Sequence, residues 1–290
     1  IKQRSSNYEI ILVNDGSTDK SAEILDEYHK RYSFIHVIHK ENGGIGSTIP
    51  LALEIAGGKY IVFVDSDDYT CEDMLLILNR SLNEYDFPDI IQFGLRMVDE
   101  NEKIIREERN GKYELSSTKD ILVDHFEKHL SPSLACRIFR KELFLKTVCP
   151  AQNVGIDEIL IVQLLMNAKS FVSIDSILYS VFIRKDSVSR SVYSDQKVRE
   201  YETVYKILFD ISSPNAYIRP YIQIKYLKLL MGLIVELDGD NALMYQKYKS
   251  YYLSVIKTNA YKKESLRFKV GTKILFYLPK MYKIIKKMKG

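Results

Sequence analysis

Residues 57–68 read GGKYIVFVDSDD and carry the clearest structural signal in the chain. Two glycines follow a predicted helix, an apolar strand occupies residues 60–64, and a run of carboxylates begins at Asp65. A strand without charged residues on either face is covered on both sides, as in the parallel sheets of α/β proteins. The sequence therefore predicts a sheet enclosed between helices, with acidic side chains at the end of one strand.

The same alternation of strands and helices extends to both sides of this stretch. Further strands are predicted at residues 9–13, 34–38, 89–93, 171–174 and 177–182, and helices at residues 21–31, 47–56, 71–85, 118–129 and 157–168. After residue 194 the pattern is helical and carries no strand signal. We expect an α/β domain at residues 1–193 and a helical region at residues 194–290.

The beginning of the chain departs from this pattern. Residues 1–6 resemble the end of a helix, whereas an α/β nucleotide-binding unit normally opens with a strand. We therefore expect the α/β domain to be N-terminally incomplete, without its first strand.

Composition and charge narrow the class of protein. With 290 residues, 46% of them apolar, the chain can bury a large core, which argues against a disordered protein. Three cysteines without a C-x-x-C spacing argue against a disulfide framework or a zinc knuckle and favour a reducing compartment, the cytoplasm. No apolar run reaches about 18 residues and no signal peptide is recognisable, so we expect no segment to span a bilayer.

Asp65 and Asp67 follow the strand at residues 60–64. In an extended segment, residues two apart point to the same side, so these two carboxylates can act together. Mg²⁺ and Mn²⁺ prefer carboxylate and phosphate oxygens, and open α/β sheets bind ligands at the carboxyl ends of their strands. The pair indicates a metal bound to a diphosphate. The alternative is that Asp67 and Asp68 only cap the next helix.

Two further turns carry candidate binding residues. Asp15, in the turn NDGSTD, follows a strand and is placed to accept hydrogen bonds from a base or ribose; the alternative is an ordinary Asp-Gly turn. The glycine-rich residues 42–47, NGGIGS, precede a helix, where the N–H groups near Asn42 and Gly43 can meet phosphate. This phosphate signal matches neither a G-x-G-x-x-G motif nor a P-loop.

Taken in order, these motifs resemble family 2 glycosyltransferases, especially bacterial enzymes that build surface polysaccharides. The resemblance covers about residues 9–190 and implies a GT-A fold and an inverting transferase. It implies that Asp15 contacts the nucleotide base, while Asp65 and Asp67 form a D-x-D pair that holds the ribose and a metal-bound diphosphate. The implied cofactor is Mn²⁺ or Mg²⁺, and the implied donor is a nucleoside-diphosphate sugar, with a UDP-sugar favoured.

The family places its catalytic base in an acidic pair that opens a later helix. Here residues 155–158 read GIDE, so Asp157 holds the matching position and Ile156 replaces the preceding Glu. An inverting displacement needs one carboxylate to take the proton of the acceptor hydroxyl. Without the resemblance, Asp157 reads as an acidic residue favoured in a first helical turn. Arg184 and Arg190 lie in a basic loop that can offset diphosphate charge, or that is simply solvated.

These residues predict sugar transfer to a hydroxyl group of a glycan or lipid-linked acceptor. Two alternatives are a degenerate nucleotide-sugar binding or scaffolding protein and, less favoured, a sugar nucleotidyltransferase. The first alternative rests on residues 49–50, which are Ile-Pro where the family usually has Arg-Asn, and on Ile156.

The C-terminal region suggests a surface contact. Residues 262–290 contain ten Lys or Arg residues and one acid, and residues 268–288 predict a basic amphipathic helix. Its apolar side is predicted to consist of Leu275, Leu278, Met281, Tyr282 and Ile285. Such a helix can lie on an anionic membrane, here the inner face of the plasma membrane, or pack on the protein. Tyrosines at helical spacing indicate packing between helices, so we expect no nucleic-acid partner.

Overall fold

The computed structural model describes residues 2–5, 7–183, 194–213, 215–236 and 242–287. The chain forms two compact units. The first comprises Ile1–Leu122 and Ser131–Ser189, and the second comprises Val123–Leu130 and Arg190–Gly290. The boundary that the sequence predicts after residue 193 stays a prediction.

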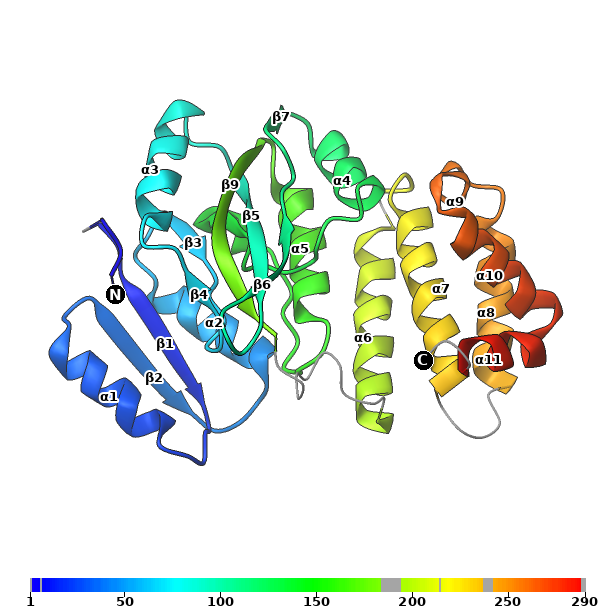
Figure 1. Ribbon diagram of the computed structural model, residues 1–290, viewed down its shortest axis with the longest axis horizontal. Coiled ribbons are helices and arrows are strands. Elements are labelled where there is room, and N and C mark those ends of the chain that lie inside the picture. The colour runs from blue at the N-terminus through cyan, green and yellow to red at the C-terminus, as the bar shows by residue number, and fades with distance from the viewer. Residues whose placement is uncertain (1, 6, 184–193, 214, 237–241, 288–290) are drawn as a thin grey trace. The chain divides into compact units, whose positions relative to one another are not determined.

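The first unit combines strands and helices, as expected (Figure 1). Its elements are β1 (Ile10–Asp15), α1 (Ser21–Arg31), β2 (Ile35–Lys40), α2 (Ile45–Ile55), β3 (Tyr60–Val62), β4 (Tyr69–Thr70), α3 (Met74–Glu84), β5 (Ile90–Val98), β6 (Ile104–Glu108), β7 (Tyr113–Leu115), α4 (Thr118–Glu127), β8 (Arg137–Arg140), the 3₁₀ helix η1 (Lys141–Phe144), α5 (Ile156–Asn167) and β9 (Phe171–Phe182). α4 continues from the first unit into the second.

The strands form two sheets. β1 and β2 pair in parallel, and a seven-stranded sheet has the order β3-β8-β5-β9-β4, with β6 on β5 and β7 on β9. The α/β class is confirmed, but the expectation of a mostly parallel sheet is wrong: in the larger sheet only β5 and β9 pair in parallel among the described strands. Parallel neighbours need a long crossover, whereas short connections such as that from β5 to β6 give antiparallel pairs.

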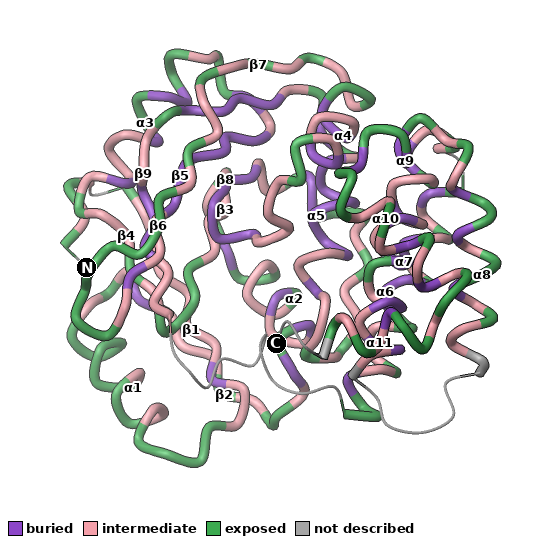
Figure 2. Tube along the Cα trace, turned by 45° about the vertical axis from the view of Figure 1, so that its right-hand side comes forward, coloured by how far each residue is buried: buried purple, intermediate pink, exposed green. Residues whose placement is uncertain are grey.

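The core of the first unit lies around β5 and α5, which are largely buried in Figure 2. Ile90, Ile91 and Phe93 of β5 have no exposed surface, and eight of the twelve residues of α5 are buried. A helix that is apolar on all sides is a core helix. α5 therefore gives a fixed support to Asp157, which lies in its first turn.

The N-terminal residues are not the end of a helix, so that expectation is wrong for the described residues 2–5. They pack against the start of α3 instead. The side-chain amide of Gln3 donates to Cys71 O at 2.7 Å and accepts the N–H of Leu75 at 2.9 Å. This contact satisfies one of the N–H groups that a helix leaves unpaired at its N-terminus.

The second unit is helical, as expected, with α6 (Asp195–Ile211), α7 (Arg219–Glu236), α8 (Ala242–Val255), α9 (Asn259–Lys263), α10 (Leu266–Tyr277) and α11 (Pro279–Lys287). Its tyrosines pack between helices. Tyr248 is fully buried, stacks on Tyr252 with ring centroids 6.1 Å apart, and donates its hydroxyl to Thr272 O. None of the described helices has the length and apolar character needed to cross a membrane.

The prediction of a single amphipathic helix at residues 268–288 is wrong. The helix is interrupted at Leu278, which does not have helical geometry. Leu278 precedes Pro279, and the α conformation is disfavoured for a residue before proline. Leu275 and Tyr282 are buried in the unit, whereas Leu278 is 52% and Met281 42% exposed. The predicted apolar side is therefore divided between the core and the surface.

Candidate active site

The acidic turn after β3, residues 65–68, is hydrogen-bonded to β9. The backbone N–H of Asp65 donates to the hydroxyl of Tyr179 at 3.0 Å, and this hydroxyl in turn hydrogen-bonds to the carboxylate of Asp68. Asp68 Oδ1 also accepts the N–H of Phe182 at 2.8 Å. Tyr179 is 1% exposed, so a core residue fixes the backbone that presents Asp65 and Asp67.

The electrostatics of this turn favour a cation. Burial raises the pKa of Asp65, and the neighbouring carboxylates of Asp68 and Asp67 raise it further, although Asp65 keeps exposed surface. The described residues contain no cluster of three or more His, Cys, Asp or Glu side chains able to hold a metal. Mg²⁺ commonly binds through one or two carboxylates together with substrate phosphates and water, so the donor set of Asp65 and Asp67 fits such an ion.

The carboxylate of Asp15 organises the glycine-rich turn. Its Oδ1 accepts the N–H of Gly43 at 2.9 Å and the ammonium of Lys40 at 2.5 Å, and its Oδ2 accepts the N–H of Gly44 at 2.8 Å. Burial opposes ionisation, but the bonds from Lys40 and the glycines outweigh it and lower the pKa of Asp15. Asn42 adds a bond from its amide to Asp15 O at 3.0 Å. The structure therefore brings Asp15, Asn42 and Gly43 together.

The glycine-rich turn also contacts the segment that leads into α5. Gly46 donates its N–H to Gln152 O at 3.0 Å, and a Cβ at Gly46 would lie 1.9 Å from Pro150 O. Only glycine permits this close approach of two backbones. The turn that the sequence assigns to the donor is thus in direct contact with the chain just before Asp157.

Pro50 lies inside α2, where it cannot supply the N–H that Gly46 O would accept. The thiol of Cys149 donates to Gly46 O at 3.2 Å instead. Ile49 beside it is buried. The Ile-Pro pair, which departs from the family pattern, is accommodated by the fold.

Asp157 shares its surroundings with the acidic turn. Gly155 precedes the helix in the left-handed conformation, and Asp157 lies in the first turn of α5. Burial raises the pKa of Asp157 to about 6, with a further contribution from Asp65, while the N–H of Leu134 and the charge of Arg137 lower it. The effect of Asp65 on Asp157 places the two carboxylates in one electrostatic environment, although they are far apart in the sequence.

Several of these contacts could not be recognised from sequence motifs. Lys40 is the last residue of β2 and pairs in register with Asp15, so parallel pairing of the first two strands would have predicted its place. Tyr179, Leu134 and Arg137 carry no local signal. Arg184 and Arg190 lie outside the described residues.

Comparison with known proteins decides the family. The family described as Glycosyl transferase family 2 matches residues 1–147, which is just over half of the 290 residues. The chain belongs to glycosyltransferase family 2. This assignment confirms the prediction of a glycosyltransferase.

Individual relatives of this family 2 glycosyltransferase cover different shares of it. The Cholesterol galactosyltransferase of Borreliella burgdorferi is 28% identical over 88% of this chain and 76% of its own length. The Poly(ribitol-phosphate) beta-glucosyltransferase of Bacillus spizizenii is 49% identical over 24% of this chain and 11% of its own length. A crystal structure of S. aureus TarS 1-349 in complex with UDP aligns with a TM-score of 0.55 at 18% identity, over 96% of this chain and 74% of that one. This likeness confirms the predicted GT-A fold.

Proposed function

We propose that this glycosyltransferase moves a sugar, with inversion, from a nucleoside-diphosphate donor to a hydroxyl group of a glycan or lipid-linked acceptor in cell-surface polysaccharide synthesis. Relatives with names such as Minor teichoic acid biosynthesis protein GgaB support the setting. A UDP-sugar is the favoured donor, because TarS crystallised with UDP and with UDP-GlcNAc.

The observation that carries the proposal is the raised pKa of Asp157, about 6, beside Asp65. A carboxyl with this pKa is ionised at neutral pH, yet it is a stronger base than an ordinary aspartate. In the proposed reaction Asp157 takes the proton of the acceptor hydroxyl. The hydroxyl oxygen forms a bond to the anomeric carbon as the bond from that carbon to the diphosphate oxygen breaks on the opposite face.

Asp65 and Asp67 are the proposed ligands of Mn²⁺ or Mg²⁺. When bound there, the ion supplies a Lewis acid for the leaving diphosphate. Asp65 also lies close enough to raise the pKa of Asp157, so the same carboxylate serves the donor side and the base side of the reaction.

Asp15, Asn42 and Gly43 are the proposed contacts to the nucleotide. Within the described chain, Oδ2 of Asp15 accepts one hydrogen bond, from the N–H of Gly44, which leaves capacity for an N–H group of the base. Lys40 neutralises this carboxylate and holds it on the turn. Arg184 and Arg190 remain proposed partners of the diphosphate.

A donor panel and one substitution test the proposal. Hydrolysis of UDP-, GDP- and dTDP-sugars with Mn²⁺ identifies the donor. Asp157→Asn is then expected to lower turnover at least about a hundredfold, because it removes the base, and to leave the affinity for UDP with Mn²⁺ nearly unchanged. Glu158→Gln, in the same helical turn, is the matched control. Wild-type turnover in Asp157→Asn would show that another group is the base.

The same measurements test the alternative that the protein binds a nucleotide sugar without transferring it. Pro50 and Ile156 depart from the family pattern and favour this alternative. Tight binding of UDP with Mn²⁺ in calorimetry, without hydrolysis of any sugar nucleotide in the panel, would support a binding or scaffolding role. Turnover of a single donor would exclude it.

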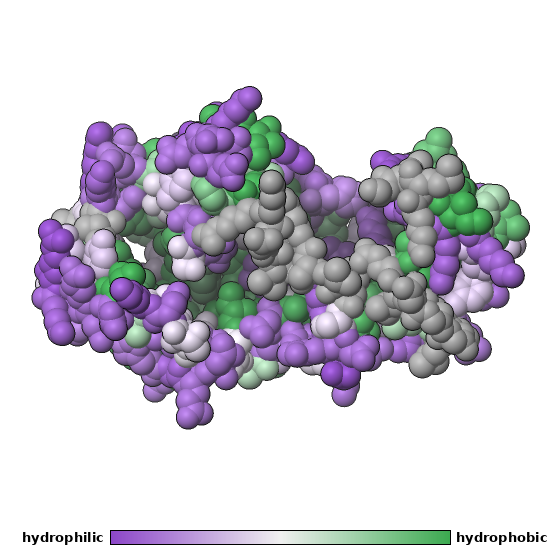
Figure 3. All heavy atoms as spheres, turned by 60° about the horizontal axis from the view of Figure 1, so that its bottom comes forward, coloured by the Kyte–Doolittle hydropathy of each residue, from purple (hydrophilic) through white to green (hydrophobic). Residues whose placement is uncertain are grey.

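We propose that the enzyme acts at the cytoplasmic face of the plasma membrane. Leu278, Met281 and Ile284 expose apolar surface at and beyond the break between α10 and α11, with Lys280 and Lys283 beside them. Among the C-terminal helices, Figure 3 shows apolar groups at the surface next to hydrophilic ones. This combination suits the surface of an anionic bilayer, where a lipid-linked acceptor would lie.

A further inference from the structure

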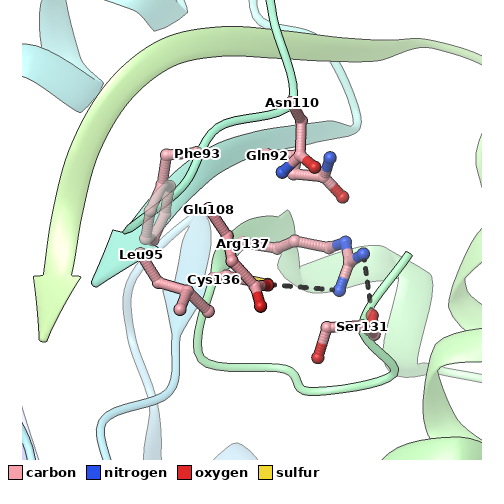
Figure 4. A pocket seen from close by; sticks show the side chains of 8 residues that line it. All are labelled: Gln92, Phe93, Leu95, Glu108, Asn110, Ser131, Cys136 and Arg137. Atoms are coloured by element: carbon pink, nitrogen blue, oxygen red, sulfur yellow. Dashed lines mark hydrogen bonds between the residues drawn. The ribbon is translucent and has the colours of Figure 1, made fainter. Parts of the chain in front are cut away.

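Arg137, the first residue of β8, is a buried cation. Only 1% of its surface is exposed, and within the described part of the chain it forms no ion pair with a carboxylate. Figure 4 shows its guanidinium reaching toward Ser131 along a small pocket that Gln92 and Asn110 also line. A charge in such a place lowers stability unless its hydrogen bonds compensate.

The compensation is incomplete. Arg137 Nε and both amide atoms of Gln92, which is fully buried, have no hydrogen-bond partner among the described residues. Each unsatisfied buried polar group lowers stability, because it gives up its hydrogen bonds to water on folding without replacement. An apolar side chain at position 137 would avoid part of this cost, so stability alone does not account for the arginine.

The guanidinium shapes the loop that precedes β8. Its Nη1 donates to Ser133 O at 2.7 Å and its Nη2 donates to Ser131 O at 3.0 Å. A planar guanidinium holds two acceptors in a fixed relation, which an ammonium cannot do. Leu134, next to these carbonyls, is buried, and its N–H hydrogen-bonds toward the carboxyl of Asp157.

We propose that Arg137 is a positioning residue that holds residues 131–134 in the conformation that directs the Leu134 N–H at the Asp157 carboxylate. This inference rests on the proposed role of Asp157 as the base. The N–H fixes the orientation of the carboxylate toward the acceptor hydroxyl. Arg137 itself touches no reacting atom.

Arg137→Met tests this inference, because methionine fills similar space without hydrogen-bonding to either carbonyl. We expect kcat for hydrolysis of the UDP-sugar identified by the panel to fall about 10- to 100-fold, with KM for the donor and the affinity for UDP with Mn²⁺ unchanged. Arg140→Met is the matched control on the same strand. Arg140 binds Asp89 and Phe87 O, so its loss should lower stability and leave kcat near the wild-type value.

Hydrogen exchange gives a readout that does not need turnover. In Arg137→Met the amide of Leu134 should exchange faster than in the wild type, and in Arg140→Met it should not. If Arg137→Met does not fold, Arg137→Lys, which keeps the charge but can reach only one carbonyl, decides between the same outcomes. Wild-type kcat, or wild-type exchange at Leu134, in a folded Arg137 variant overturns the inference. If Asp157→Asn retains turnover, the proposed role of Asp157 as the base has failed instead.

Discussion

Asp157 would control activity through its protonation state. Burial and Asp65 raise its pKa to about 6, and a base must be ionised to accept a proton. Turnover is therefore expected to be highest above this pH and to fall about tenfold for each pH unit below it. A profile of kcat/KM against pH at saturating Mn²⁺ should place the midpoint of the acid limb near 6. A midpoint near the ordinary aspartate value of about 4 would contradict the assignment.

Tyr179 acts on the metal ligands through a single hydroxyl. Tyr179→Phe removes the acceptor for the Asp65 N–H and the donor to Asp68, so the affinity for Mn²⁺ is expected to fall about tenfold or more. Calorimetry of UDP binding at varied Mn²⁺ concentrations measures this effect. Tyr60→Phe is a matched control, because Tyr60 packs against the same core and its hydroxyl donates to Pro88 O. Equal losses in the two variants would point to general loosening of the core.

Only some residues of the candidate site could be predicted from the sequence. Asp15, Asp65 and Asp157 were predicted because each follows a strand or opens a helix within a recognisable motif. Tyr179 and Arg137 could not be predicted, since each acts through contacts made only after distant segments fold together. Tyr179 reads as one more apolar residue of a strand, and Arg137 reads as a surface charge.

At the scale of elements, most strands and helices follow from apolar runs and their period. β8 was missed, because RIFR is half charged and becomes a strand only by pairing with β3 and β5. β9 was predicted as two strands, because Asp175 and Ser176 interrupt its apolar pattern. The pairing with β5 shifts register at this point, so a bulge takes up the polar residues and the strand continues.

The contact between α2 and the segment before α5 depends on one glycine. Gly46→Ala would place a Cβ 1.9 Å from Pro150 O, and because this oxygen is a backbone atom that cannot rotate away, the two elements must separate. We expect a loss of stability of about 1–3 kcal/mol or more, measured by chemical unfolding, and weaker binding of UDP with Mn²⁺. Gly57→Ala is the control, since its Cβ would meet only Glu9 Oε1 at 3.6 Å, an ordinary contact. Wild-type stability in Gly46→Ala would mean that this contact is dispensable.

At the scale of the whole molecule, the exposed apolar groups of the last two helices should matter only near a membrane. Ile284 is 60% exposed on α11, among lysines. Ile284→Asp is expected to reduce co-sedimentation with phosphatidylglycerol vesicles, while hydrolysis of a soluble UDP-sugar stays unchanged. Leu145→Asp, at a residue 78% exposed in the first unit, serves as the control. Equal binding to vesicles of neutral phosphatidylcholine would argue against an electrostatic contact.

The half-buried carboxyl of Asp157 has a consequence for the stability of the protein at neutral pH. Its folded pKa lies above that of an exposed aspartate, so the native state binds this proton more tightly than the unfolded chain does. Stability is therefore lost as the pH rises from the ordinary aspartate pKa of about 4 to the folded pKa of about 6, and it stays at the lower level above that. Asparagine at position 157 is expected to give a higher free energy of unfolding at neutral pH. At neutral pH the enzyme would therefore hold its proposed base in the ionised form at a cost in folding free energy.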